Sequence, residues 1–155
     1  MTHFRSLELA IDQATRQRDA RALAKAQALR NLEFGKNQMA QLEGYAGETD
    51  ARWVAGNLQH LSAEMVHHHY QFRERLQNAV NLQVGVIAGL QAQVEHTHQQ
   101  LLQAEYRLAG LRQVLDARRA ELLRRQARIE QRNTDEFAAQ RYARLAAEKS
   151  YGESL

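Results

Sequence analysis

A seven-residue repeat of apolar residues runs through the second half of the chain. Stepping by seven from residue 80 gives only aliphatic residues: Val80, Ile87, Val94, Leu101, Leu108, Leu115, Leu122 and Ile129. Such a repeat is typical of helices that pack along one seam, and a strict spacing of seven predicts a left-handed coiled coil. The residues three positions after each of these are mixed at first and become arginine at Arg118 and Arg125. We therefore expect the seam to change from apolar to basic near residue 118.

The first third of the chain also has a helical pattern, with a less regular apolar stripe. The stripe contains Leu7, Ile11, Ala14, Ala22, Ala26, Leu29, Leu32, Met39 and Leu42. Ser6 suits the N-cap of this helix. Glu8 and Asp12 lie where the positive end of the helix dipole favours acidic residues. The pattern predicts a helix over about residues 5–56.

Two segments could reverse the chain, residues 44–50 and residues 56–62, because both contain glycine and other turn residues. The later turn gives an antiparallel hairpin in which facing residue numbers add up to about 118. Leu42 then faces Leu76, Leu7 faces Leu111, and the first helix ends where the seam becomes basic. We therefore predict a turn at about residues 57–61 and a second helix over about residues 62–148, whose last quarter has no partner.

Composition supports an all-α fold, a long two-helix antiparallel coiled-coil hairpin formed by residues 1–155 as a single domain. The 155 residues include no proline and no cysteine; proline costs about 3 kcal/mol inside a helix. The lack of cysteine excludes disulfides and thiol catalysis. The longest apolar run, residues 84–90, is much shorter than the roughly 20 residues that cross a bilayer, and the start does not resemble a secretory signal. We expect a soluble, cytoplasmic protein.

Positive charge concentrates in one part of the second helix. The chain has a net charge of +3, and residues 112–132 contain seven arginines against three acidic residues. Such a cluster is usually a solvated helix face. Nucleic-acid binding is the alternative, but the chain has no recognised nucleic-acid module and little aromatic interleaving. We expect no nucleic-acid partner.

Three consecutive histidines, His67 to His69, resemble a metal motif only in the sequence, because neighbouring helix positions point about 100° apart. His60, Glu64 and His68 have a better spacing, but they offer three ligands where structural zinc sites usually have four. We interpret the histidines as exposed polar residues beside the turn. We expect no metal, no cofactor and no enzymatic activity, since a two-helix rod offers no concave site that excludes water.

Apolar and aromatic residues gather near the expected hairpin tip. The pairing described above brings together Leu42 and Tyr45 on the first helix with Phe72, Leu76 and Ala79 on the second. Two aromatic side chains exceed what a narrow two-helix seam hides, so part of this strip is expected to face outward as a docking surface. Packing within the seam alone is the alternative.

Three segments together resemble the FliJ family of the bacterial flagellar type III export apparatus. They are SLELAIDQATRQRDARALAKAQ (residues 6–27), QLEGY (41–45) and QRNTDEFAAQRYAR (131–144), and the two unequal helices extend the resemblance over nearly the whole chain. The resemblance implies a non-enzymatic coiled coil similar to the central stalk of rotary ATPases. It also implies binding to the hexameric export ATPase FliI, to the export gate protein FlhA and to export chaperones. The implied location is the cytoplasmic side of the inner membrane at the flagellar base, with peripheral association through protein partners.

The resemblance also implies site residues. Its gate-docking strip corresponds to Gln38, Leu42, Tyr45, Phe72, Leu76 and Ala79, and this chain departs from the family strip at Thr49 and Gln83. By geometry and analogy, the ATPase-binding end would include Leu7, Ile11, Arg118, Arg119, Arg124 and Arg125. Three alternatives stay open: the equivalent stalk of a virulence-type injectisome, a basic coiled coil that binds nucleic acid or acts as a scaffold, and a histidine-based metal carrier.

Overall fold

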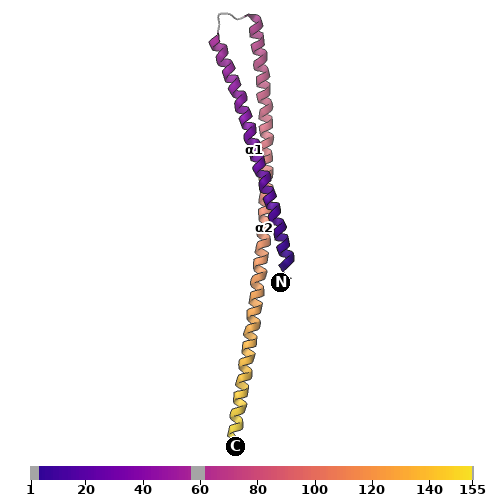
Figure 1. The fold of residues 1–155 in the computed structure, drawn as a ribbon, viewed down its shortest axis with the longest axis vertical. Coiled ribbons are helices and arrows are strands. Elements are labelled where there is room, and N and C mark those ends of the chain that lie inside the picture. Colours follow the sequence, from indigo (N-terminus) through magenta and orange to yellow (C-terminus); the bar gives the residue numbers. More distant parts are fainter. Residues whose placement is uncertain (1–3, 57–61, 155) are drawn as a thin grey trace. The chain divides into compact units, whose positions relative to one another are not determined.

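A computed structural model describes residues 4–56 and 62–154. They form two helices, α1 (Arg5–Gly56) and α2 (Ala63–Glu153), and contain no strand (Figure 1). Parts of the two helices pack against each other in opposite directions, so the predicted all-α helical hairpin is confirmed. Residues 44–50, the alternative turn, are helical within α1. The expected turn at residues 57–61 lies outside the described residues.

The starts of the two helices differ from each other. Ser62 caps α2, because its Oγ accepts a hydrogen bond from the Met65 backbone N–H at 3.2 Å, and this satisfies one of the unpaired donors of the first turn. Ser6 was expected to cap α1, but α1 already begins at Arg5. The prediction of Ser6 as an N-cap is therefore wrong, and Ser6 lies in the first turn of the helix.

The chain divides into two compact units, Asp12–Leu108 and the pair of segments Met1–Ile11 with Ala109–Leu155. In the unit Asp12–Leu108, the two helices share a regular seam. Along α1 the positions spaced by seven, which we label a, are residues 18, 25, 32, 39, 46 and 53, and the d positions are residues 14, 21, 28, 35, 42 and 49. Along α2 the a positions are residues 66, 73, 80, 87, 94, 101 and 108, and the d positions are residues 69, 76, 83, 90, 97 and 104. All of these residues except Arg21 and Arg73 are buried or half-buried.

The expected α1 stripe is wrong in its middle part. Ala22 and Leu29 are exposed, whereas the basic residues Arg18, Arg21 and Lys25 occupy seam positions. Long cationic side chains can do so because their aliphatic stems cover apolar surface while the charged heads stay near water. A pattern search based on apolar residues alone therefore selects the wrong face here.

The pairing of the two helices also differs from the expected one. Asp50 contacts Arg73, Trp53 contacts His69, and Arg21 contacts Gln100, so that facing residue numbers add up to about 122 rather than 118. Leu42 is therefore opposite Val80 instead of Leu76. The difference of about four residues is one helical turn.

The two helices pack closely around Gly35. The Gly35 carbonyl accepts a hydrogen bond from Gln83 Nε2 at 2.8 Å. A Cβ atom on Gly35 would lie 2.7 Å from Leu90 Cδ1 and 3.7 Å from Ile87 Cγ1. Because residue 35 has no side chain, Leu90 and Ile87 of α2 can fill the space beside it.

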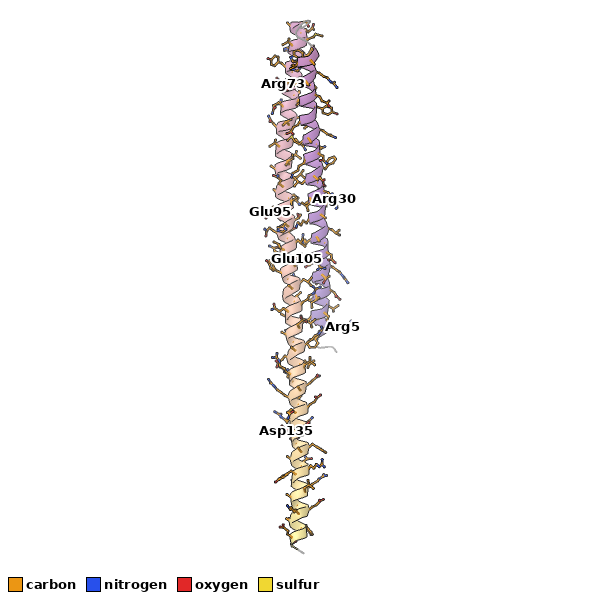
Figure 2. All side chains as sticks on the ribbon, turned by 90° about the vertical axis from the view of Figure 1, so that its left-hand side faces the viewer. Arg5, Arg30, Arg73, Glu95, Glu105 and Asp135 are labelled. Carbon is orange, nitrogen blue, oxygen red and sulfur yellow. The ribbon has the colours of Figure 1, made fainter. Side chains whose placement is uncertain are left out.

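In the other unit, the start of α1 packs along α2. Leu115 is buried, and Phe4, Leu7, Ile11 and Leu111 are half-buried. Across this part of the seam, Arg119 of α2 pairs with Glu8 of α1 at 3.1 Å. From Leu122 to Ser154 every residue is exposed, and Figure 2 shows side chains around Asp135 pointing away from α2 in several directions. Ile129, the last residue of the apolar repeat, is 57% exposed, so the repeat continues beyond its packing partner.

Candidate functional site

The seam divides the surface of the unit Asp12–Leu108 into two flanks. The residues immediately before the a positions form what we call the g flank. The residues immediately after the d positions form the e flank. Two antiparallel helices are related by a twofold rotation about an axis perpendicular to the plane that contains both helices. This rotation exchanges the two helices but leaves each flank on the same side of that plane. The g residues of α1 and α2 therefore lie on the same side of the seam. Gln83 donates a hydrogen bond to Gln38 on the g flank at 3.3 Å, and Arg73 pairs with Asp50 on the e flank at 3.1 Å.

All six residues of the expected gate-docking strip lie in this unit, at d or g positions. Leu42 and Leu76 are half-buried seam residues at d. The other four lie on the g flank: Gln38, Tyr45, Phe72 and Ala79. Tyr45 is 61% exposed and Phe72 is 46% exposed. The structure thus brings the strip to one flank of one unit, with its aromatic members accessible and its leucines packed between the helices.

Thr49 and Gln83, where the chain departs from the family strip, are both half-buried at d positions. Gln83 contacts α1 through its hydrogen bonds to the Gly35 carbonyl and to Gln38. Its amide group therefore holds the two helices together and is largely occupied within the hairpin.

Sequence reasoning missed three exposed apolar residues that continue this surface. Val86 lies on the g flank, and Leu82 and Phe34 lie at its outer edge; they are 50%, 74% and 65% exposed. A usable signal was present in the sequence, since residues 76–94 contain no charged residue in a chain with 25% charged residues. Exposed apolar side chains in an uncharged segment form the kind of surface that marks protein interaction sites.

The histidine cluster contains one contact that contradicts its interpretation as exposed polar residues. The His69 ring stacks on Trp53, with ring centroids 3.9 Å apart and an interplanar angle of 5°, and His69 is half-buried. His67 and His68 are exposed. In the part of the chain that the structure describes, no group of three His, Cys, Asp or Glu residues could hold a metal ion. His60, which the candidate metal set requires, lies outside the described residues.

The expected ATPase-binding residues lie in the other unit. Most of them already have contacts within the protein. Leu7 and Ile11 are half-buried in its seam. Arg119 pairs with Glu8 at 3.1 Å. Arg124 and Arg125 both pair with Glu121, at 3.5 and 3.4 Å.

Arg118 and Arg125 line one surface groove with Phe4, Glu121 and Leu122. Exposed ion pairs contribute only about 0.2–1 kcal/mol each, so Arg119, Arg124 and Arg125 can exchange their present partners for others at little cost.

Neither helix, within its described residues, has a stretch apolar and long enough to cross a membrane. A family model described as flagellar FliJ protein matches residues 3–146. The comparisons with curated proteins and with solved structures gave no match. The family match extends over both helices and supports a role related to flagellar protein export. The chain belongs to the FliJ family of flagellar proteins.

Proposed function

We propose that this protein is a non-enzymatic coupling component of flagellar protein export. It binds the export ATPase FliI, promotes assembly and activity of the ATPase ring, connects the ring to the export gate protein FlhA, and escorts export chaperones. The observation that carries this proposal is the FliJ family match over residues 3–146. The two-helix architecture, with a surface on each unit suited to a protein partner, agrees with it.

The gate-binding surface in this proposal is the g flank around Tyr45 and Phe72. Both aromatic rings are exposed and lie on the same flank, and aromatic residues often dominate the binding energy of protein interfaces. Leu42 and Leu76 support this surface from the seam, so their replacement would disturb the hairpin as well as binding.

The test is gate binding by the double variant Tyr45→Ala, Phe72→Ala. We expect affinity for the cytoplasmic part of the gate protein to fall at least about tenfold, as for loss of typical interface anchors, while helical content by circular dichroism stays unchanged. Tyr70→Ala is the matched control, because Tyr70 is 68% exposed on the e flank. Equal affinity of the double variant and the unmodified protein would remove the g flank from the proposed interface.

The ATPase-binding surface in this proposal is the unit that contains Arg118, Arg119, Arg124 and Arg125. Arginines that extend from an otherwise exposed helix can guide association with a complementary acidic surface, which affects association rate more than final affinity. Leu7 and Ile11 contribute by holding the start of α1 against α2.

Two measurements test this part. Adding the protein to purified export ATPase should stimulate ATP hydrolysis and ring assembly. Charge reversal at Arg124 and Arg125 should slow association in low salt, and reversal at Arg75, an exposed arginine of the other unit, should have little effect. An ATPase that hydrolyses ATP and assembles equally with and without the protein would contradict the coupling role.

The proposed location is the cytoplasmic side of the inner membrane at the flagellar base. There the protein would associate with the membrane-embedded apparatus through its protein partners. We do not expect the protein to bind duplex DNA or RNA. Binding to either with a steep dependence on salt would indicate a coiled coil that binds nucleic acid instead.

A further inference from the structure

A groove on the g flank of the unit Asp12–Leu108 is lined by arginine and amide side chains from both helices. α1 contributes Gln17 and Arg21, and α2 contributes Gln100, Gln103, Ala104 and Arg107. The groove has a volume of ≈ 440 Å³, which lies within the range of roughly 300–1,000 Å³ found for small-molecule sites. It is far along the helices from Tyr45 and Phe72, so it is a separate feature of the same flank.

No carboxylate lines this groove. Asp19 lies close in the sequence but pairs with Arg18 at 2.9 Å. Glu105 follows Ala104 but occupies an e position, so it lies on the opposite flank. Among the described residues of this unit, no g position on either helix holds an acidic residue. The positive charge of the groove is therefore not neutralised from its own flank.

The cationic groups of the groove remain available to bind an anion. Arg21 Nη1 donates a hydrogen bond to Gln100 Oε1 at 3.1 Å, and this neutral partner leaves the guanidinium charge uncompensated. Within the described chain, Arg107 forms no ion pair, and neither does Lys25, a half-buried seam residue on the next turn of α1 after Arg21. Arg21 and Arg107 thus line one groove without an anionic partner.

We propose that this groove binds a phosphate-class oxyanion with several charges, held between Arg21 and Arg107. Guanidinium groups bind phosphate through paired N–H donors, and the glutamine amides add further N–H donors. Arg107 lies seven residues beyond Gln100, the partner of Arg21, or about 10 Å along α2. An ion with two or more phosphate groups can contact both guanidinium groups, whereas a single carboxylate can neutralise only one.

The test is calorimetric titration of the full chain with pyrophosphate at low salt. We expect saturable binding with one site per chain. Arg21→Gln and Arg107→Gln should each weaken it by about tenfold or more, because each removes charge-assisted hydrogen bonds to the ion. Arg52→Gln is the matched control, since Arg52 is an exposed g-flank arginine outside the groove and its loss changes the net charge equally. Because Arg107 contacts no other described side chain through an ion pair, Arg107→Gln tests the site without disturbing the seam.

Parallel titrations with ADP and adenosine identify the source of the phosphate groups. ADP binding that depends on Arg21 and Arg107, without adenosine binding, assigns the site to a nucleotide diphosphate group. Pyrophosphate binding without ADP binding assigns it to free oligophosphate. The thermal midpoint of unfolding should rise with pyrophosphate, because a ligand that binds only the folded state stabilises it. Absence of saturable pyrophosphate binding, or equal weakening by all three substitutions, would overturn the proposal.

Discussion

At the scale of single residues, Gly35 is a glycine at which the two helices pack closely. Its carbonyl is hydrogen-bonded to Gln83, and Leu90 and Ile87 fill the space beside it. Gly44 also lies inside α1, but a Cβ added there would meet no atom within 4 Å apart from its chain neighbours and the adjacent backbone of its own helix. Two glycines in one helix therefore have different roles, and only the contacts across the seam distinguish them.

Gly35→Leu should destabilise the hairpin, because the new side chain must displace Leu90 or separate the helices. Forcing extra carbons into a packed site costs about 1–3 kcal/mol. Gly44→Leu should instead be neutral or stabilising by up to about 1 kcal/mol, since leucine favours the helix more than glycine does. Urea unfolding followed by circular dichroism measures both variants. Equal stability of the two variants would contradict the close approach of the helices at Gly35.

The Trp53–His69 stack gives a second prediction, which tryptophan fluorescence can test. Trp53 is the only tryptophan of the chain, and the His69 ring covers one of its faces. His69→Ala should expose the indole to water, shift its emission to longer wavelength and lower stability by about 0.5–1.5 kcal/mol, the contribution of an aromatic pair. His68→Ala is the control, because His68 is exposed. An unchanged emission spectrum in His69→Ala would contradict the stack.

At the scale of the helices, the same residue type has different roles along α2. Leu108 is 2% exposed, whereas Leu123 is 65% exposed. The seam itself alternates between aliphatic stretches and a polar stretch in which Lys25 of α1 lies opposite Thr97 of α2. Thr97 is 4% exposed, and its hydroxyl donates to the backbone carbonyls of Gln93 and Val94, at 3.0 and 2.9 Å. A buried hydroxyl is tolerated there because it is satisfied within its own helix.

Leu108→Ala and Leu123→Ala compare these environments with one chemical change. Leu108→Ala should lower the free energy of unfolding by about 2–4 kcal/mol, because it removes a buried side chain and leaves a cavity. Leu123→Ala should change it by less than about 0.5 kcal/mol, as expected for an exposed position. Chemical denaturation of both variants under the same conditions is the measurement. A large loss in Leu123→Ala would indicate that residue 123 packs against a partner.

At the scale of the whole molecule, stability is distributed unevenly along the chain. α2 has a packed seam from Val80 to Leu115, but every residue from Leu122 to Ser154 is exposed. An isolated helix is marginally stable in water, and most helix stability in proteins comes from tertiary packing. This exposed part of α2 also carries Arg124 and Arg125 of the proposed ATPase-binding surface.

Hydrogen exchange of the free protein should show this difference directly. Backbone amides of residues 123–153 should exchange much faster than those of residues 80–115, because local opening is easy where few apolar contacts must break. Addition of the export ATPase should slow exchange in residues 123–153 if this segment binds the ring. Equal protection of both segments in the free protein would show that the terminal part of α2 is already packed in solution.

The fold class and the main apolar repeat could be predicted from the amino-acid sequence alone. The lack of proline and the unbroken series from Val80 are local properties, and they indicate long helices without knowledge of any contact. The approximate position of the gate-docking strip also followed from the sequence, through its resemblance to a family. That strip stays a prediction until binding is measured.

Which turns of the two helices face each other could be seen only in the packed hairpin. A seven-residue repeat is unchanged by a shift of one repeat and nearly unchanged by a shift of one turn, so it leaves the pairing open. The packed hairpin has one pairing, in which α2 packs closely on Gly35, Arg21 lies beside Gln100 and Trp53 lies beside His69. Basic residues at the seam escaped sequence reasoning for the same reason: a long side chain becomes part of a core through its neighbours.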